Sequence, residues 1–501
     1  MKTNWKDTRV LILGAARQGL ALARWLSLHG ARVTLSDMRS EAELHVAHES
    51  VAEYPIQWAL GGHPLELLDS TDVLCLSGGV PLTLPIIVEA LKRGIPLSND
   101  SQIFMEVVPC KTIGITGSAG KTTTTTLVGE MAKIAYGKDE GRRRKDEDSS
   151  VTPAAASSSA NAFHPSSFII HPSAFVGGNI GDPLINYVDD MQPDDLAILE
   201  LSSFQLDQMT ISPNIAAILN VTANHLDRHG TMEAYAAAKA RILEFQSKDD
   251  IAILGRDDKG AWSLRDKVEG KLFTFSLNEL EEGLDGAYLH DGLLNLRADN
   301  VYMPLIARRK IRLRGDHNVL NVLAAFTIGF AAGFPLDAMW KAVEEFRGVP
   351  HRLEFVRELR GARWYNDSMA TAPERSVAAI RSFEEPIVLL LGGRDKDLPW
   401  EDLMSLVGER VKRAVLFGEA AEKIQKTATS LGLSRPALSG VETKRCALSR
   451  VNTLRDAVVM AAEVAEPGDV VLLSPGGTSF DEFKDFAERG ERFKAWVQEL
   501  S

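Results

Sequence analysis

The architecture of the central part of this chain can be predicted from one segment, Thr116-Gly117-Ser118-Ala119-Gly120-Lys121-Thr122-Thr123. It follows an apolar strand predicted at 112–115 and precedes a helix predicted at 123–134. A glycine-rich turn between a strand and a helix points several backbone N–H groups at one spot, where the positive end of the helix dipole adds to them. A lysine there reaches the outer phosphates of a nucleotide, and a following hydroxyl group binds Mg²⁺. The segment therefore predicts a site for the triphosphate of ATP or GTP.

The loop is shorter than the standard eight-residue pattern, because Ile115 stands where that pattern requires its first glycine. An ordinary turn that contains Gly-Lys-Thr is the alternative interpretation. The strand before the loop, the helix after it and the run of threonines favour phosphate binding.

Composition limits the class of protein. A chain of 501 residues is too long for one hydrophobic core and predicts about three domains. The formal net charge of −12 gives no electrostatic reason to bind nucleic acid. Three scattered cysteines, the absence of a signal-peptide pattern and the lack of an apolar stretch long enough to span a membrane predict a cytoplasmic location.

Strand and helix patterns divide the chain into three α/β blocks, at about 1–110, 111–348 and 349–501. The first block has a strand at 10–13, a turn from Gly14 to Gly19, a helix, and a second strand followed by Asp37, which is the layout of a dinucleotide-binding fold. Ala16 replaces the middle glycine of that fingerprint, so a turn that serves only close packing is the alternative. The second block combines parallel β/α order with short strands between 271 and 313, and the third is again α/β.

A segment at about 137–173 interrupts the second block. It begins with mixed basic and acidic residues and continues with Ala- and Ser-rich sequence that has few large apolar residues before Phe163. Such a composition cannot offset the entropy of ordering by burial, so a mobile insert is predicted. A binding patch is the alternative for its basic residues, but the neighbouring acids balance their charge.

Polar residues follow two further predicted strands of the second block. Glu200 closes a strand at 196–199, and His225 comes after a strand at 216–219. Because the carboxyl ends of parallel strands line the ligand crevice of α/β proteins, Glu200 is well placed to bind Mg²⁺ beside the phosphate loop. Lys239 lies in a helix predicted at 231–245, where an exposed lysine is the simplest interpretation of the residue taken alone.

Together these motifs resemble those of the Mur ligases, the amide-bond ligases of peptidoglycan synthesis, and the glutamate-adding members are the most similar. The resemblance runs in order from about residue 10 to 497, apart from the insert. The motifs are Thr116-Gly117-x-x-Gly120-Lys121-Thr122, Gly177-Gly178-Asn179-Ile180-Gly181, Glu200-Leu201-Ser202-Ser203-Phe204-Gln205-Leu206, Asn220-Val221-Thr222-x-x-His225-x-Asp227, His317-Asn318-x-x-Asn321, Pro350-His351-Arg352, Asn366-Asp367-Ser368, and Ser474-Pro475 through Ser479-Phe480-Asp481.

The resemblance implies a fold and an activity. It implies a Rossmann-like N-terminal domain for the UDP substrate, a central P-loop ATPase domain with a mainly parallel sheet and a small antiparallel annex, and a Rossmann-like C-terminal domain for the amino acid. The expected enzyme is a monomer that uses ATP and two Mg²⁺ ions to join D-glutamate to UDP-N-acetylmuramoyl-L-alanine through an acyl phosphate. Neither chemical step needs a protein nucleophile.

The resemblance also implies roles for individual residues. The expected catalytic residues are Lys121, His225 and Lys239, and CO₂ is expected to carbamylate Lys239 and so give it an oxygen ligand for the metal. The expected metal ligands are Thr122, Glu200, His225 and Lys239. The expected ATP contacts are Gly117, Gly120, Lys121, Thr122, Thr123, Asn318, Asn321, Arg352 and Asp367. The expected contacts to the UDP substrate are Gly14, Gly19, Asp37, Gly79 and Asn179, and those to glutamate are Thr371, Lys396, Ser479 and Phe486.

The chain departs from the glutamate-adding pattern at three positions. Ala119 replaces an asparagine, Met369 a lysine and Met38 a hydroxyl residue. None of the three is an expected metal ligand, so an active enzyme is predicted. The alternatives are a ligase for another amino acid, L-glutamate included, a folate-type polyglutamate ligase, and a P-loop scaffold that binds nucleotide without ligation. The Rossmann-like first block argues against the folate-type ligase.

Overall fold

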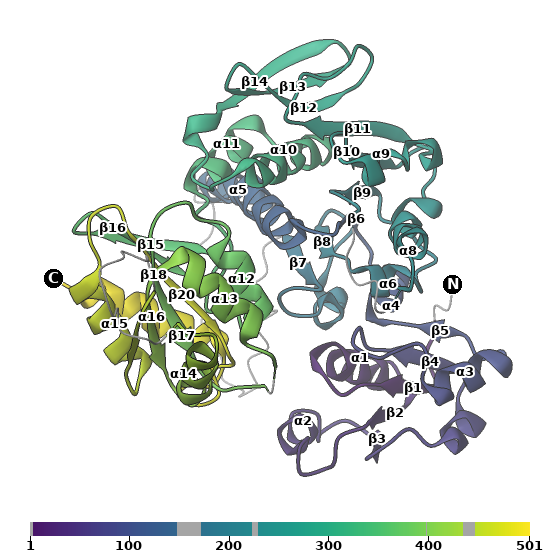
Figure 1. The fold of residues 1–501 in the computed structure, drawn as a ribbon. Coiled ribbons are helices and arrows are strands. Elements are labelled where there is room, and N and C mark those ends of the chain that lie inside the picture. Colours follow the sequence, from purple (N-terminus) through teal and green to yellow (C-terminus); the bar gives the residue numbers. More distant parts are fainter. Residues whose placement is uncertain (1–3, 148–171, 223–228, 397, 434–445) are drawn as a thin grey trace. The chain divides into compact units, whose positions relative to one another are not determined.

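A computed structural model describes residues 4–147, 172–222, 229–396, 398–433 and 446–501 (Figure 1). The chain divides into two compact units, Met1–Phe346 and Arg347–Ser501. The first unit contains two sheets and the second contains one. These three sheets confirm the three α/β domains that the sequence predicts.

The first sheet has five parallel strands in the order β3-β2-β1-β4-β5. Residues Val10 to Leu13 are buried in the central strand, as expected for a parallel sheet that is covered on both faces. The strand order reverses between β1 and β4, where α/β proteins have their ligand crevice. The elements are β1 (Arg9–Leu13), α1 (Arg17–Leu28), β2 (Arg32–Asp37), α2 (His45–Glu49), β3 (Ile56–Leu60), η1 (Leu65–Ser70), β4 (Val73–Leu76), α3 (Pro85–Lys92), β5 (Leu97–Ser98) and α4 (Asp100–Val107).

The second sheet has nine strands in the order β14-β13-β12-β11-β10-β9-β6-β8-β7. Strands β7 to β12 and β6 pair in parallel, whereas β12, β13 and β14 pair antiparallel and form the predicted annex. The strands are β6 (Lys111–Thr116), β7 (Ala174–Gly178), β8 (Leu196–Glu200), β9 (Ile215–Ile218), β10 (Ile251–Gly255), β11 (Lys271–Ser276), β12 (Gly286–His290), β13 (Leu293–Ala298) and β14 (Val301–Ala307). The helices are α5 (Lys121–Glu147), η3 (Leu184–Asn186), η4 (Val188–Asp190), α6 (Ser203–Leu206), α8 (Met232–Glu244), α9 (Lys259–Trp262), η5 (Arg265–Lys267), η6 (Arg308–Lys310), α10 (Asp316–Ala331) and α11 (Leu336–Glu345).

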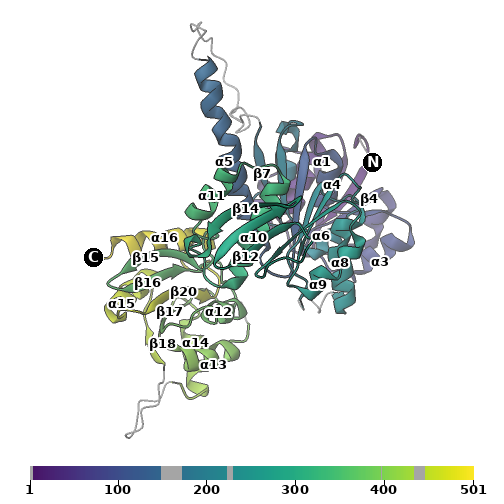
Figure 2. The ribbon, with the colours of Figure 1, turned by 90° about the horizontal axis from the view of Figure 1, so that it is seen from above.

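Helix α5 is longer than the sequence analysis predicts. Its first half packs into the core through Leu127, Val128 and Met131, and the expected end at Ile134 is wrong because the helix continues to Glu147. Figure 2 shows its second half extending away from the sheet. Lysine, glutamate and arginine favour helix, and a helix that has started adds residues at little cost. The rest of the predicted insert, 148–171, lies outside the described residues.

The longest apolar stretch of the chain forms a core helix. Helix α10 lies beside α5, and its residues from Val322 to Gly329 are all buried (Figure 1). In the part of the chain that the structure describes, no helix is both long enough and apolar enough to cross a membrane.

The sheet of the second unit has six strands in the order β15-β16-β20-β17-β18-β19, all parallel except for the β15–β16 hairpin. Its central strands β17 and β20 are completely buried, so side chains cover both faces of the sheet. The elements are β15 (Glu354–Leu359), β16 (Ala362–Asn366), α12 (Pro373–Ile380), β17 (Ile387–Gly392), α13 (Glu401–Arg410), β18 (Val411–Phe417), α14 (Ala421–Ser430), β19 (Ala447–Arg450), α15 (Leu454–Val464), β20 (Val470–Gly476) and α16 (Phe486–Glu499).

Candidate functional site

The phosphate loop joins β6 to the N-terminus of α5, as predicted. Gly120 has φ +85°, a conformation that favours glycine, and a Cβ atom there would lie 2.2 Å from Oδ1 of Asn321. The loop therefore requires glycine at this position for two reasons, and it leaves the first N–H groups of α5 for an anion.

A residue outside the expected site holds the loop in shape. Asn220 accepts a hydrogen bond from the Ala119 N–H at 2.8 Å and donates one to the Ala119 carbonyl at 3.0 Å. Its own carbonyl accepts the Ser118 N–H at 3.0 Å. Because Asn220 binds the main chain of residue 119, this contact tolerates alanine there. Two sequence features could have identified Asn220: its position directly after a buried strand and its place at the start of the motif Asn220-Val221-Thr222.

Two lysines converge on the start of the loop. Nζ of Lys121 donates to the Gly117 carbonyl at 2.8 Å, and Nζ of Lys239 donates to the same oxygen at 3.0 Å. Lys239 is 1% exposed, so the interpretation as an exposed helical lysine is wrong. Two lysine amino groups therefore meet at one carbonyl oxygen beside the phosphate loop.

Burial changes the acid–base behaviour of Lys239. Removal from water, together with the positive charge of Lys121, lowers the pKa of Lys239 from 10.5 to about 7. Its Nζ lies 4.7 Å from the centre of the Tyr235 ring, one helical turn earlier in α8. A substantial fraction of Lys239 is therefore a neutral amine near pH 7.

Glu200 has the properties of a cation ligand. It ends β8, pairs in register with Ile115 of β6 and is 1% exposed. Its Oε1 accepts a hydrogen bond from Nδ2 of Asn179 at 2.9 Å, but its buried Oε2 has no hydrogen-bond partner. A buried carboxylate oxygen without a donor is costly unless a cation binds it, so Glu200 fits a magnesium site.

The other expected metal ligands are placed unequally. Thr122 lies half-buried in the first turn of α5, beside Lys121. His225 lies outside the described residues. Among the residues that are described, no three His, Cys, Asp or Glu side chains form a cluster that could hold a metal ion. Of the expected metal ligands, Glu200 is the one described residue of these four types. The Thr122 hydroxyl and a modified Lys239 would have to supply the other described ligands.

Two expected ATP contacts lie at the start of α10. Nδ2 of Asn321 donates to Oδ1 of Asn318 at 3.1 Å, and Nδ2 of Asn318 donates to the Arg314 carbonyl at 2.7 Å. Asn321 lies against the phosphate loop, because its Oδ1 occupies the place that a Cβ atom on Gly120 would need. The structure thus brings these two asparagines together with the loop, across about 200 residues of chain.

The glycine turn of the first sheet is tightly packed. Gly14 has φ +100°, and a Cβ atom on Gly19 would lie 2.0 Å from the Gly14 carbonyl oxygen. Asp37 accepts the Ala15 N–H at 2.7 Å and binds the Arg39 guanidinium at 2.8 Å, which holds the pKa of its carboxyl far below the usual range. Asp37 therefore supports the turn directly.

The same turn contacts the central domain. Nε2 of Gln18 donates to the Gly178 carbonyl at 3.2 Å, next to Asn179. Gly79 follows β4 near the turn, and a Cβ atom there would have no neighbour within 4 Å. Met38 is 63% exposed, so a hydroxyl is not needed there for packing.

Asp367 is a buried acid of the second unit. It is 6% exposed, and its carboxylate accepts hydrogen bonds from Oγ of Ser474 at 2.8 Å and from the Leu353 N–H at 3.2 Å. Burial raises the pKa of Asp367 to about 7, although the nearby charge of Arg352 opposes the shift. The structure therefore brings these two expected ATP contacts close to each other.

The expected glutamate contacts come from three segments of the second unit. Thr371 precedes α12, Ser479 is 2% exposed in the loop after β20, and Phe486 begins α16. Lys396 is exposed in the loop after β17. Backbone hydrogen bonds between Arg394 and Thr478, at 2.8 and 2.9 Å, bring the loops of Lys396 and Ser479 side by side.

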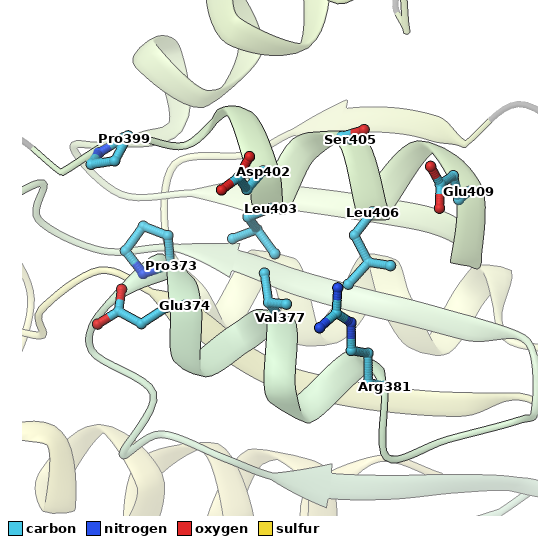
Figure 3. A pocket seen from close by; sticks show the side chains of 10 residues that line it. All are labelled: Pro373, Glu374, Val377, Arg381, Pro399, Asp402, Leu403, Ser405, Leu406 and Glu409. Carbon is cyan, nitrogen blue, oxygen red and sulfur yellow. The ribbon is translucent and has the colours of Figure 1, made fainter. Parts of the chain in front are cut away.

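A hollow of about 430 Å³ lies elsewhere in the second unit, between α12 and α13 (Figure 3). It contains none of the expected site residues. Its floor is apolar and its charged side chains lie at the exposed rim. The lining residues are Pro373, Glu374, Val377, Arg381, Pro399, Asp402, Leu403, Ser405, Leu406 and Glu409.

Comparison with protein families gives three matches along the chain. Residues 8–99 match the Mur ligase MurD-like N-terminal domain, residues 179–329 the Mur ligase middle domain, and residues 351–477 the domain described as Mur ligase, glutamate ligase domain.

Two bacterial proteins are similar over nearly the whole chain. The UDP-N-acetylmuramoylalanine–D-glutamate ligase of Symbiobacterium thermophilum is 37% identical over 493 residues, which cover 98% of this chain and 98% of that protein. The protein of the same name from Acidobacterium capsulatum is 38% identical over 495 residues, covering 98% of this chain and 96% of that protein. Among solved structures, the UDP-N-acetylmuramate-alanine ligase of Thermotoga maritima has a TM-score of 0.51 at 19% identity, covering 98% of this chain and 100% of that one, and so shares the fold.

Proposed function

The chain belongs to the Mur ligase family of ATP-dependent amide-bond ligases, and we propose that it adds D-glutamate to UDP-N-acetylmuramoyl-L-alanine in peptidoglycan synthesis. Relatives named for this reaction are similar over 98% of the chain. The main structural support is Lys239, which is buried beside the phosphate loop and shares the Gly117 carbonyl with Lys121. A scaffold that only bound nucleotide would need Lys121 but not a second, buried lysine.

The proposed reaction has two steps. The alanine carboxylate attacks the γ-phosphorus of ATP, ADP leaves, and an acyl phosphate forms. The amine of D-glutamate then attacks the carbonyl carbon, phosphate leaves with one carboxylate oxygen, and an amide bond remains. Lys121 and the N–H groups at the start of α5 hold the outer phosphates, so the charge that moves onto the leaving phosphate is compensated.

Mur ligases require magnesium, and the described residues fit it. We propose that Thr122, Glu200, His225 and Lys239 hold two Mg²⁺ ions. Asn179 orients Glu200 by donating to Oε1, which leaves Oε2 for the metal. Bound Mg²⁺ supplies positive charge that lowers the repulsion between the carboxylate and the γ-phosphate.

We further propose that Lys239 is carbamylated. Among the described residues, Lys239 bonds only to Oγ1 of Thr116, at 3.4 Å, and to the Gly117 carbonyl. A buried lysine that served only stability would be paired with an acid. Its burial favours the neutral amine, which is the form that attacks CO₂, with release of a proton. The carbamate would offer oxygen to a metal that prefers oxygen ligands.

The other expected roles follow the three domains, which we place at 1–110, 111–348 and 349–501. Gly14, Gly19 and Gly79 bind the UDP part, with Asp37 supporting the turn. Arg352, Asp367, Asn318 and Asn321 bind ATP, and Thr371, Lys396, Ser479 and Phe486 bind D-glutamate. A UDP-linked sugar and ATP are both substrates of the cytoplasm, where we expect the enzyme to act as a monomer.

The experiment is an assay of ADP release by the purified chain with ATP, Mg²⁺, UDP-N-acetylmuramoyl-L-alanine and one amino acid. We expect release with D-glutamate, little with L-glutamate, and a product mass equal to the sum of the two substrates less water. ADP release only with another amino acid would overturn the proposed substrate. ATP binding without amino-acid-dependent turnover would overturn the assignment of ligase activity.

A further inference from the structure

One arginine of the second unit is completely buried among neutral partners. Arg489, in the first turn of α16, is 0% exposed. Its Nε donates to Oγ of Ser368 at 2.9 Å, Nη2 donates to the Ser368 carbonyl at 2.9 Å, and Nη1 donates to the Gly477 carbonyl at 3.1 Å. The guanidinium is thus held at three points without a carboxylate among these acceptors.

A buried cation of this kind is costly. Desolvation lowers the pKa of Arg489 to about 10, and the negative charges of Asp481 and Glu482 only partly oppose this. Arg489 stays protonated at neutral pH, so an incompletely compensated positive charge persists in the interior. Such a charge becomes favourable when an anion binds nearby.

The partners of Arg489 lie in the segments that carry the expected amino-acid contacts Thr371, Ser479 and Phe486. Oγ of Ser368, which receives its Nε–H, donates to the Phe486 carbonyl at 2.7 Å. Gly477 precedes Thr478, whose backbone pairs with Arg394 in the loop of Lys396. The Arg489 guanidinium therefore connects the segments around residues 368, 477 and 486. Its positive charge is buried next to all three segments.

We propose that Arg489 is a positioning residue of the amino-acid site, and that its buried charge favours an anionic amino acid. It holds the loops of Ser368 and Gly477 against the start of α16, and it adds a fixed positive field to the exposed cation of Lys396. Because the guanidinium is ordered before the substrate arrives, its contribution requires no reorganisation on binding. This inference rests on the proposed function.

The test compares Arg489→Met, which keeps the length but removes the charge, with Arg489→Lys, which keeps the charge. We expect Arg489→Met to raise the KM for D-glutamate about tenfold or more, with KM for ATP and for the UDP substrate changed by less than about twofold. Arg489→Lys should recover most of the affinity for glutamate. Arg492→Met, on the same helix and 61% exposed at its side chain, is the matched control and should leave all three KM values unchanged.

A uniform rise in all three KM values, or a lower Tm with unchanged kinetics, would overturn the inference and leave Arg489 a structural residue. If Arg489→Met does not fold, Ser368→Ala removes one acceptor but keeps the cation, and a rise confined to the KM for glutamate is again expected. An unchanged glutamate KM in this variant would contradict the positioning role. The wild-type requirement for D-glutamate is measured first, so failure of the proposed function is recognised separately.

Discussion

Among single residues, Lys239 shows how burial in the fold changes the protonation of a side chain. It lies on α8 in a stretch of small residues, and the packing of that helix removes its ammonium group from water. The positive charge of the Lys121 ammonium also disfavours protonation of Lys239. A lysine of this kind is kept for reactivity more readily than for stability.

Lys239→Ala should therefore abolish ligation, with a loss of about 100-fold or more, because the proposed oxygen ligand of the metal would be missing. Small carboxylates such as acetate should restore part of the rate by occupying the vacated space. The measurement is the initial rate of ADP release with and without acetate. Lys248→Ala, an exposed lysine after α8, serves as control. Full activity of Lys239→Ala would exclude the proposed role.

The burial of Asp100 should make the free energy of unfolding depend on pH. It is buried at the start of α4, its Oδ1 has no hydrogen-bond partner, and burial raises the pKa of its carboxyl from 3.8 to about 6. Because the folded pKa exceeds the unfolded one, this group's stabilising contribution is complete below about pH 4 and is lost as the pH rises through about 6. Two pKa units correspond to about 3 kcal/mol.

Asp100→Asn should consequently raise the free energy of unfolding at pH 7.5 by up to about 3 kcal/mol and change it little at pH 4. Urea unfolding at both pH values provides the measurement. Asp249→Asn, at an exposed position, should show no such pH-dependent difference. Equal effects of Asp100→Asn at both pH values would contradict the assigned titration.

Among the elements, the strand–loop–helix unit around Gly120 forms the proposed site for the phosphates of ATP. Gly120→Ala introduces a Cβ atom 2.2 Å from Oδ1 of Asn321 at a residue with φ +85°. We expect a loss of about 1–3 kcal/mol in the free energy of unfolding and a much weaker affinity for ATP. Gly137→Ala in the same helix meets no neighbour within 4 Å and should be neutral or stabilising. Calorimetric titration with ATP measures the affinity of both variants. Equal affinities of Gly120→Ala and Gly137→Ala for ATP would refute the requirement for glycine at position 120.

The elements show what sequence could predict. Buried strands at β1, β6, β8 and β9 follow from short apolar runs, and the geometry of parallel strands then brings Glu200 beside the phosphate loop. The length of α5 was missed because its charged second half was judged by its composition as an insert. The roles of Asn220 and Arg489 were missed because Ala119 and Ser368, which they contact, lie 101 and 121 residues away along the chain, where local patterns contain no information.

At the scale of the whole molecule, the expected contacts are divided between two compact units. The first unit contains the phosphate loop, Glu200 and Lys239, and the second contains Asp367, Ser479 and Phe486. Ligation as proposed therefore needs both units, because the carboxylate is activated at residues of the first and the amino acid is bound by residues of the second. The family resemblance predicted that the metal ligands and the glutamate contacts lie in different domains. Residue patterns alone indicated only three α/β blocks.

The proposed ligation depends on activation of a carboxylate as an acyl phosphate. The most direct measurement uses UDP-N-acetylmuramoyl-L-alanine labelled with ¹⁸O in its carboxylate, followed by mass analysis of the phosphate released during ligation with D-glutamate. We expect one ¹⁸O atom in each phosphate, because the attacking oxygen leaves with phosphorus when the amide forms. Phosphate without ¹⁸O, formed while labelled substrate is consumed, would contradict it.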